Sequence, residues 1–185
     1  MPFVSEVLGK PVTDIDGNYL GVLEELIARE RKNVNHPVVE AVIVVNKGKS
    51  ISVPCTATMS LFAPAIPLKF RVDEIPAFVM NDEKDIYLAR DVLDKQIIDT
   101  DGARVVRVND LELMRYQNTL YVTNVDVGLL GLLRRTPMRK ISDSIVNKFN
   151  IPFKENYISW DNVELLAHDQ FMRLKAVSYT HLRAH

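Results

Sequence analysis

An internal repeat constrains the fold of this chain more than any other feature of its sequence. When the sequence is shifted by 85 residues, VTDIDGNYLGVLEEL at residues 12–26 falls on IIDTDGARVVRVNDL at residues 97–111. Seven positions are identical: Val7, Leu8, Lys10, Asp14, Asp16, Gly17 and Leu26 match Val92, Leu93, Lys95, Asp99, Asp101, Gly102 and Leu111. Repetition at a fixed spacing indicates units of the same supersecondary structure. We therefore expect two copies of one small fold.

Each copy has the pattern of short strands joined by turns. The Asp-Gly pairs at residues 16–17 and 101–102 are strong hairpin signals. Residues 38–45 are rich in β-branched side chains, as a buried strand requires. Residues 22–31 alternate loosely, and their spacing leaves a helix open as an alternative. Many short strands with regular turns predict a mainly β protein, a small sandwich or barrel in each copy.

The second copy carries an extra segment at residues 128–156. Apolar residues recur within it at helical spacing, which predicts a short helix over residues 142–150 that ends before Pro152. After this insertion, residues 158–161 (ISWD) resemble residues 51–54 (ISVP). Aligning these two stretches matches Trp160 of the second copy to Val53 of the first. We expect Trp160 to lie in the core at that position.

These patterns divide the chain into a first domain at residues 3–78, a linker at 79–84 and a second domain at 85–168. Asp82, Glu83 and Asp85 indicate an exposed connection between the domains. The last ten residues, 176–185, fit poorly with what precedes them and are interpreted as a non-native tail. No apolar run approaches the ~20 residues of a spanning helix, so the chain as given is expected to be soluble.

Four motifs resemble the PRC-barrel family. They are Leu-Gly-Lys at residues 8–10, Asp-x-Asp-Gly at 14–17, the strand at 21–26 that ends in an acidic-hydrophobic step, and Ile-Ser-Trp-Asp at 158–161. The second copy departs from the pattern, with Asp94 and Val106 in place of Gly9 and Gly21. Three stretches, residues 86–113, 125–135 and 157–166, look like the paired barrels of bacterial MgtE-type magnesium-transporter-like proteins. The resemblance implies two tandem small PRC-type β-barrels, the second with a short helical insertion.

The resemblance also implies a function. In that group the barrels form a cytosolic head, so the chain is expected to be a non-catalytic regulatory or assembly module, cytoplasmic or at the inner face of the membrane. Its implied partners are downstream MgtE-type and CBS-type domains, and a homo-oligomer is left open. The alternative is a free-standing assembly factor similar to the ribosome maturation factor RimM, which would bind a ribosomal protein or RNA. The net charge of −1 argues against nucleic acid as a partner.

The Asp-x-Asp-Gly motif also invites comparison with a calcium loop. From Asp14 onward, Asp16, Asn18 and Glu25 stand at ligand positions of an EF-hand loop, but Tyr19 occupies the position that needs Gly. In the second copy, Arg104 takes that position. Asp14, Asp16, Asp99 and Asp101 are therefore only weak metal candidates. We favour a hairpin in which Asp side chains bind turn amides.

No pattern points to catalysis or to a cofactor. Cys55 is the single cysteine and is expected to be a buried thiol, His36 pairs with nothing by motif, and no Gly-rich phosphate loop is present. Lys10 and Lys95 recur in the two copies but are interpreted as surface lysines. The remaining candidate is a basic segment that could face a partner or a membrane, unless its leucines pack on the barrel. Its charged residues are Arg134, Arg135, Arg139 and Lys140.

Overall fold

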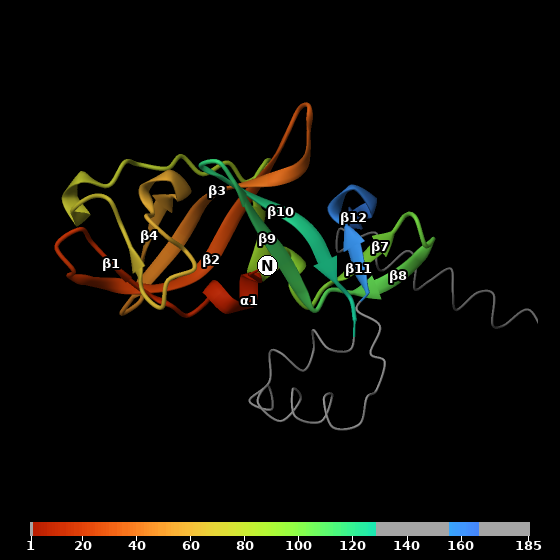
Figure 1. The fold of residues 1–185 in the computed structure, drawn as a ribbon, viewed down its shortest axis with the longest axis horizontal. Helices are drawn as coiled ribbons and strands as arrows, with labels where there is room; N and C mark the ends of the chain where they lie inside the picture. Colours follow the sequence, from red (N-terminus) through yellow and green to blue (C-terminus); the bar gives the residue numbers. More distant parts are fainter. Residues whose placement is uncertain (1, 129–155, 167–185) are drawn as a thin grey trace, which may run out of the picture.

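The structure is a computed structural model that describes residues 2–128 and 156–166. It confirms a mainly β protein. The described strands form one nine-stranded sheet, curled into a half-barrel, and a separate three-stranded sheet (Figure 1). Within these ranges, no helix combines the length and the apolar character needed to cross a bilayer. The predicted helix at residues 142–150 lies outside the described residues.

The first copy starts with a one-turn helix and continues mostly as strands. Its elements are α1 (Val4–Val7), β1 (Pro11–Thr13), β2 (Tyr19–Arg31), β3 (Val34–Asn46), β4 (Lys49–Pro54), η1 (Cys55–Ala57), β5 (Ile66–Pro67) and η2 (Val72–Glu74). Residues 22–31 are thus strand, and the helical alternative is wrong. The last strand, β5, is short, because only Ile66 and Pro67 pair with β1.

The second copy repeats this order. Its elements are β6 (Ile86–Tyr87), η3 (Leu88–Val92), β7 (Gln96–Asp99), β8 (Arg104–Arg107), β9 (Asp110–Tyr116), β10 (Thr119–Asp126), β11 (Tyr157–Ser159), η4 (Trp160–Asn162) and β12 (Val163–Leu165). The short helix η3 is a π-helix, one residue longer than its counterpart α1. The repeat in sequence is therefore a repeat in structure.

Backbone hydrogen bonds follow the offset of 85 residues closely. The amide of Gly9 donates to the carbonyl of Leu23 at 2.7 Å, and the amide of Asp94 donates to the carbonyl of Val108 at 3.0 Å. Gly9 has a φ of +78° and Asp94 has a φ of +62°. Aspartate is among the few residues that adopt this left-handed conformation readily. The replacement of Gly9 by Asp94 therefore keeps the backbone of the repeat.

The long strand β2 is the main point at which the copies differ. In the first copy, β2 is continuous and pairs with β1 near its start and with β3 beyond it. Gly21 lets β2 approach β3 closely at this point, because the Cβ of any other residue would lie 2.8 Å from the carbonyl carbon of Val45. In the second copy the same stretch is cut into β8 and β9, which belong to different sheets. Val106 occupies the position of Gly21 on β8, which among the described strands pairs only with β7.

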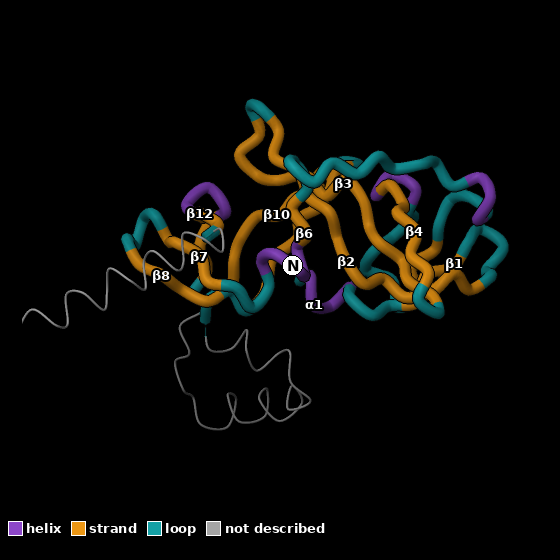
Figure 2. Tube along the Cα trace, turned by 180° about the vertical axis from the view of Figure 1, so that it is seen from behind, coloured by secondary structure: helices purple, strands orange, loops and turns teal. Residues whose placement is uncertain are grey.

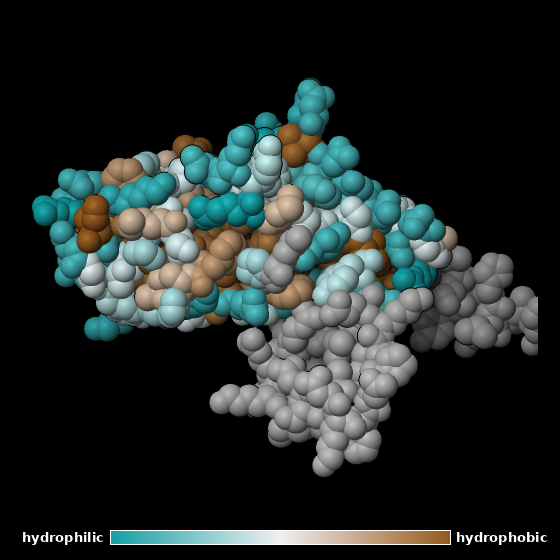
Figure 3. Space-filling model, viewed as in Figure 1, coloured by the Kyte–Doolittle hydropathy of each residue, from teal (hydrophilic) through white to brown (hydrophobic). Residues whose placement is uncertain are grey.

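The tip of the hairpin formed by β2 and β3 projects away from the rest of the described structure. Its turn is the pair Lys32 and Asn33, with Asn33 at a φ of +68°. Figures 1 and 2 show the tip projecting on the same side of the molecule as η4. The surface over this hairpin is mostly hydrophilic (Figure 3). The tip of the hairpin therefore lies outside the core, whereas the rest of β2 and β3 contributes buried side chains to it.

Strands of the two copies share the large sheet. Strand β10 pairs with β3 at Tyr121 and Val38, and β6 pairs with β2 through Tyr87 and Ile27. A bridge between Phe3 and Glu112 joins the start of the chain to β9. One hydrophobic core also contains buried side chains from both copies. Strands on either side of the predicted linker at residues 79–84 are thus hydrogen-bonded into one sheet.

The position of Trp160 in the repeat differs from the sequence alignment. Val53 pairs with Val42 in the first copy, and Ile158 pairs with Val125 in the second. Trp160 is the first residue of η4, just as Cys55 is the first residue of η1. Trp160 therefore corresponds to Cys55 and not to Val53. Its expected core role is confirmed, because only 4% of its surface is exposed.

Candidate functional site

The first Asp-x-Asp-Gly motif forms a hairpin turn held by the carboxylate of Asp14. One oxygen of Asp14 accepts hydrogen bonds from the amides of Asp16 and Asn18 at 3.0 and 2.8 Å, and the other accepts from the side chain of Asn18 at 3.0 Å. The hydrogen bond from the Asn18 side chain, joined by those from the two amides, keeps the pKa of Asp14 below its usual range. Asp16 points outward and pairs with Arg71 at 2.8 Å.

The second motif repeats this arrangement with different partners. Asp99 accepts a hydrogen bond from the amide of Gly102 at 3.0 Å and pairs with Arg104, also at 3.0 Å. The Gly102 amide, followed by Arg104, lowers the pKa of Asp99. Asp101 is exposed. The expectation that Asp side chains bind turn amides is therefore confirmed for Asp14 and Asp99.

The weak metal candidates are not gathered into one cluster. Among residues 2–128 and 156–166, no group of three or more His, Cys, Asp or Glu side chains is placed to hold a metal ion. The carboxylates of Asp14 and Asp99 instead accept hydrogen bonds from backbone amides of their own turns. In the second copy the guanidinium of Arg104 adds a positive charge beside Asp99, as the sequence suggested.

Sequence reasoning missed a buried carboxylate that joins the two copies. Glu25 on β2 accepts hydrogen bonds from the amides of Ala89 and Arg90, at 2.6 and 2.8 Å, in the first turn of η3. It also accepts from the amide of Leu26 at 2.8 Å. Burial raises the pKa of Glu25, although these three amides act in the opposite direction. The carboxylate of one copy thus supplies acceptors to the helix of the other.

Asp110 makes the reciprocal contact. It stands 85 residues after Glu25 and accepts hydrogen bonds from the amide of Ser5, at 3.1 Å, and from the Ser5 hydroxyl. Its own neighbour Leu111 donates a third at 2.9 Å. Ser5 lies in α1 and corresponds to Arg90 in η3. Reciprocal contacts of this kind are typical of a two-fold symmetric interface, here built within one chain. We call the contacts of Glu25 with η3 and of Asp110 with α1 the carboxylate clamp.

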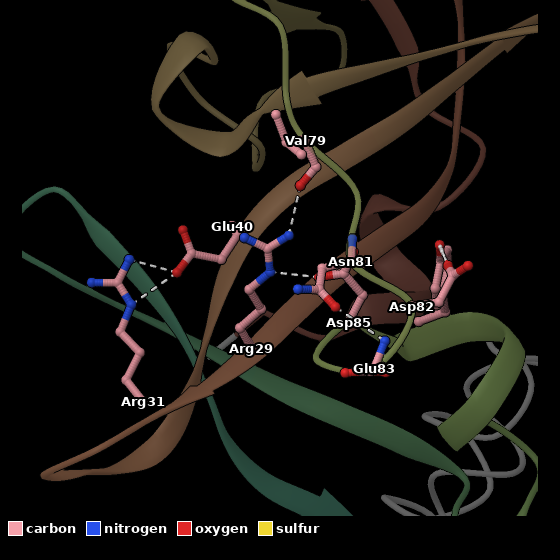
Figure 4. A network of polar contacts seen from close by, with 9 residues as sticks. Arg29, Arg31, Glu40, Val79, Asn81, Asp82, Glu83 and Asp85 are labelled. Atoms are coloured by element: carbon pink, nitrogen blue, oxygen red, sulfur yellow. Dashed lines mark hydrogen bonds and ion pairs between the residues drawn. The ribbon is translucent and has the colours of Figure 1, made fainter.

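The connection between the copies is anchored to β2 by Arg29 (Figure 4). The guanidinium of Arg29 pairs with Asp85 at 2.5 Å, donates to the carbonyl of Val79 at 2.8 Å and lies over the ring of Phe78. The other oxygen of Asp85 accepts from the amide of Asn81 at 2.6 Å. Burial alone would raise the pKa of Asp85, but Arg29 and the Asn81 amide keep it below its usual range. Asp85, expected on an exposed linker, is therefore buried.

Two adjoining recesses open beside the seam between the copies. They have volumes of about 460 and 630 Å³ and share Glu30, Trp160 and Val163 in their linings. One wall is the β2–β3 hairpin, the second is the connection at residues 83–86, and the third is η4 with β12. We call the two recesses together the seam cleft. Ligand sites occur preferentially between structural units, so this cleft is the strongest candidate site in the described part of the chain.

Other residues considered from the sequence lie apart from each other. Cys55 is partly buried, and this burial raises the pKa of its thiol. His36 lies on β3, three residues after the turn of the hairpin, with its Nδ1 atom 3.8 Å from a carboxylate oxygen of Asp161. Lys10 donates to the carbonyl of Leu61 at 3.2 Å, and Lys95 is exposed. The structure therefore assembles no nucleophile, base and orienting group from these residues.

The predicted partner or membrane surface cannot be compared with the structure. Arg134, Arg135, Arg139 and Lys140 lie outside the described residues, as do His168 and the proposed tail at residues 176–185. The basic surface therefore stays a prediction from the sequence.

Comparison with known proteins adds no identity. No family model matches this chain, and no curated protein matches it either. The carboxylate clamp and the seam cleft are therefore the features of the molecule that bear on its function.

Proposed function

We propose that this chain is a non-catalytic regulatory or assembly module that acts through contacts with other domains, as the head of a magnesium-transporter-like protein. The observation that carries the proposal is the carboxylate clamp. Glu25 and Asp110 are buried, and buried carboxylates are common acid-base groups in enzymes. Here both are occupied by backbone amides of the opposite copy. Their arrangement supports a structural role, which is to fix two copies as one body.

A fixed body is what such a module needs in order to present a constant surface to a neighbouring domain. Preformed surfaces bind with a smaller entropic cost than surfaces that must be ordered on contact. The seam cleft fits this requirement, because its walls come from both copies and from the connection between them. Its shape therefore depends on the carboxylate clamp and on the anchoring of the connection by Arg29.

The proposal is tested by the coding sequence that follows the codon for Lys175, before the proposed tail, in the source genome. An open reading frame that continues into an MgtE-type helical domain or CBS domains is the expected result. The longer protein is then probed by hydrogen exchange, and backbone amides along the clamp and cleft should gain protection when those domains are present. A stop codon at this point would reject the transporter-like context and favour the free-standing assembly factor.

A further inference from the structure

We propose that the seam cleft binds a lysine- or arginine-rich extended segment of a partner protein. This inference rests on the proposed function and names the chemistry of the contact that the module would make. The cleft has an apolar floor, walls from three separate parts of the chain and a rim with an excess of carboxylates.

The floor of the cleft is apolar. Trp160 and Val163 line both recesses, and Ile86 and Leu165 line the larger one. Trp160 is almost fully buried and the other three are partly buried, so the floor is held in place by the core beneath it. The methylene stems of lysine and arginine side chains pack well on such surfaces while their charged ends reach the rim. The floor therefore suits long cationic side chains.

The rim of the cleft carries more negative than positive charge. Glu30, Glu83 and Glu164 are exposed there, and no ion pair or hydrogen bond engages their carboxylates within the described residues. Asp161 adds a fourth acidic group. The cationic residues of the rim are Lys32 and Lys84, since Arg31 is already paired with Glu40 at 2.5 Å. The remaining charge attracts a cationic partner.

The opposite end of the molecule provides an internal comparison. By the repeat, Cys55 takes the place of Trp160, and Arg115 takes the place of Glu30. Arg115 lies close enough to Cys55 for its charge to act on the thiol, as Glu30 lies beside Trp160. Equivalent positions of the repeat therefore hold a glutamate in the seam cleft and an arginine near Cys55. At this position of the repeat, the acidic charge of the seam cleft is not required by the fold.

Trp160 provides a direct readout, because it is the only tryptophan in the chain. The full chain is titrated with a short synthetic peptide in which lysine alternates with leucine, and with a counterpart in which glutamate replaces every lysine. Saturable change in Trp160 fluorescence is expected with the lysine peptide alone, and it should weaken as salt is added. The double variant Glu30→Lys/Glu164→Lys should bind the lysine peptide at least about tenfold more weakly.

The matched control is Glu24→Lys, which reverses an exposed charge on β2 outside the cleft. This variant should bind as the wild type does, and circular dichroism should show that all variants are folded. Equal binding by the wild type and the double variant, or equal binding of both peptides, would overturn the proposal. Neither result bears on the reading frame after Lys175, so failure here can be told apart from failure of the proposed function.

Discussion

Glu25 and Asp110 occupy the same position in the two copies, and each accepts backbone hydrogen bonds from the short helix of the other copy. Each helix is too short to be stable alone, and its first amides need acceptors. The acceptors come from the partner copy, so neither helix is completed without the other half of the chain. The copies are thereby made interdependent.

The first prediction concerns this clamp. Glu25→Ala should leave the amides of Ala89 and Arg90 without acceptors in a buried place, which costs roughly 2–3 kcal/mol in the free energy of unfolding. Asp110→Ala should have a cost of the same order for the same reason. Urea denaturation followed by circular dichroism measures both. Glu24→Ala is the control on the exposed side of β2, and a loss as large as that of Glu25→Ala would contradict the role of the clamp.

The second prediction concerns pH. Asp14 and Asp99 have lowered pKa values in the folded chain, so they stabilise it above the ordinary aspartate pKa of about 3.9 and this stability is lost as the pH falls. Asp14→Asn with Asp99→Asn should flatten the acid side of the stability curve. Thermal unfolding measured between about pH 3 and pH 7 tests this, and an unchanged slope would count against it.

The third prediction separates Glu25 from the turn aspartates. Its pKa is raised, so its ionised form is the disfavoured one in the folded chain. Ionisation of Glu25 therefore lowers the free energy of unfolding as the pH rises, and protonation of Glu25 raises it again on acidification. Glu25→Gln should make the loss of stability on acidification steeper than in the wild type. The same thermal series measures it, and a shallower loss would show that the sign is wrong.

The fourth prediction uses two glycines of the first copy. A Cβ at Gly21 would lie against the backbone of Val45, at a φ of +149°, so Gly21→Ala should cost about 2–3 kcal/mol. Gly9→Asp introduces the residue that the second copy already holds at this position, with nothing within 4 Å of the added Cβ. Its cost should stay below about 1 kcal/mol. Urea denaturation ranks the two, and a reversed order would contradict the close approach of β2 and β3.

The fifth prediction concerns the anchored connection. Arg29→Ala leaves the buried carboxylate of Asp85 without its cation, which should cost about 3 kcal/mol and speed hydrogen exchange at residues 79–85. Replacing both partners, as Arg29→Met/Asp85→Leu, removes the buried charges together and should cost less than Arg29→Ala alone. If the double variant is the less stable of the two, the ion pair is not what holds the connection.

The sequence was most informative where structure depends on neighbouring residues. The turns at Asp14 and Asp99 follow from contacts within five residues, so the local pattern predicted them. The strand β3 was equally clear from its β-branched side chains. The helical alternative for residues 22–31 failed because these residues, whose spacing was ambiguous, pair with β3 along most of their length.

The clamp and the seam cleft were missed because their partners lie far apart in the sequence. Glu25 and Ala89 are separated by 64 residues, and Ser5 and Asp110 by 105. A signal was nevertheless present, since an acidic residue followed by leucine recurs at the same place in both copies. The register of Trp160 was misread for a related reason. The insertion between β10 and β11 removed the fixed offset that had aligned the rest of the repeat.

The distance between Ser5 and Asp110 also has a consequence for protein synthesis. The chain is made from its N-terminus, and the acceptor for α1 is added 105 residues after Ser5. The chain must therefore be made at least as far as Asp110 before α1 receives its acceptor. Until then the nascent first copy carries an uncovered sheet edge and an open apolar face, which are the features that chaperones recognise. We therefore expect the first copy to fold fully only after the second copy has been made.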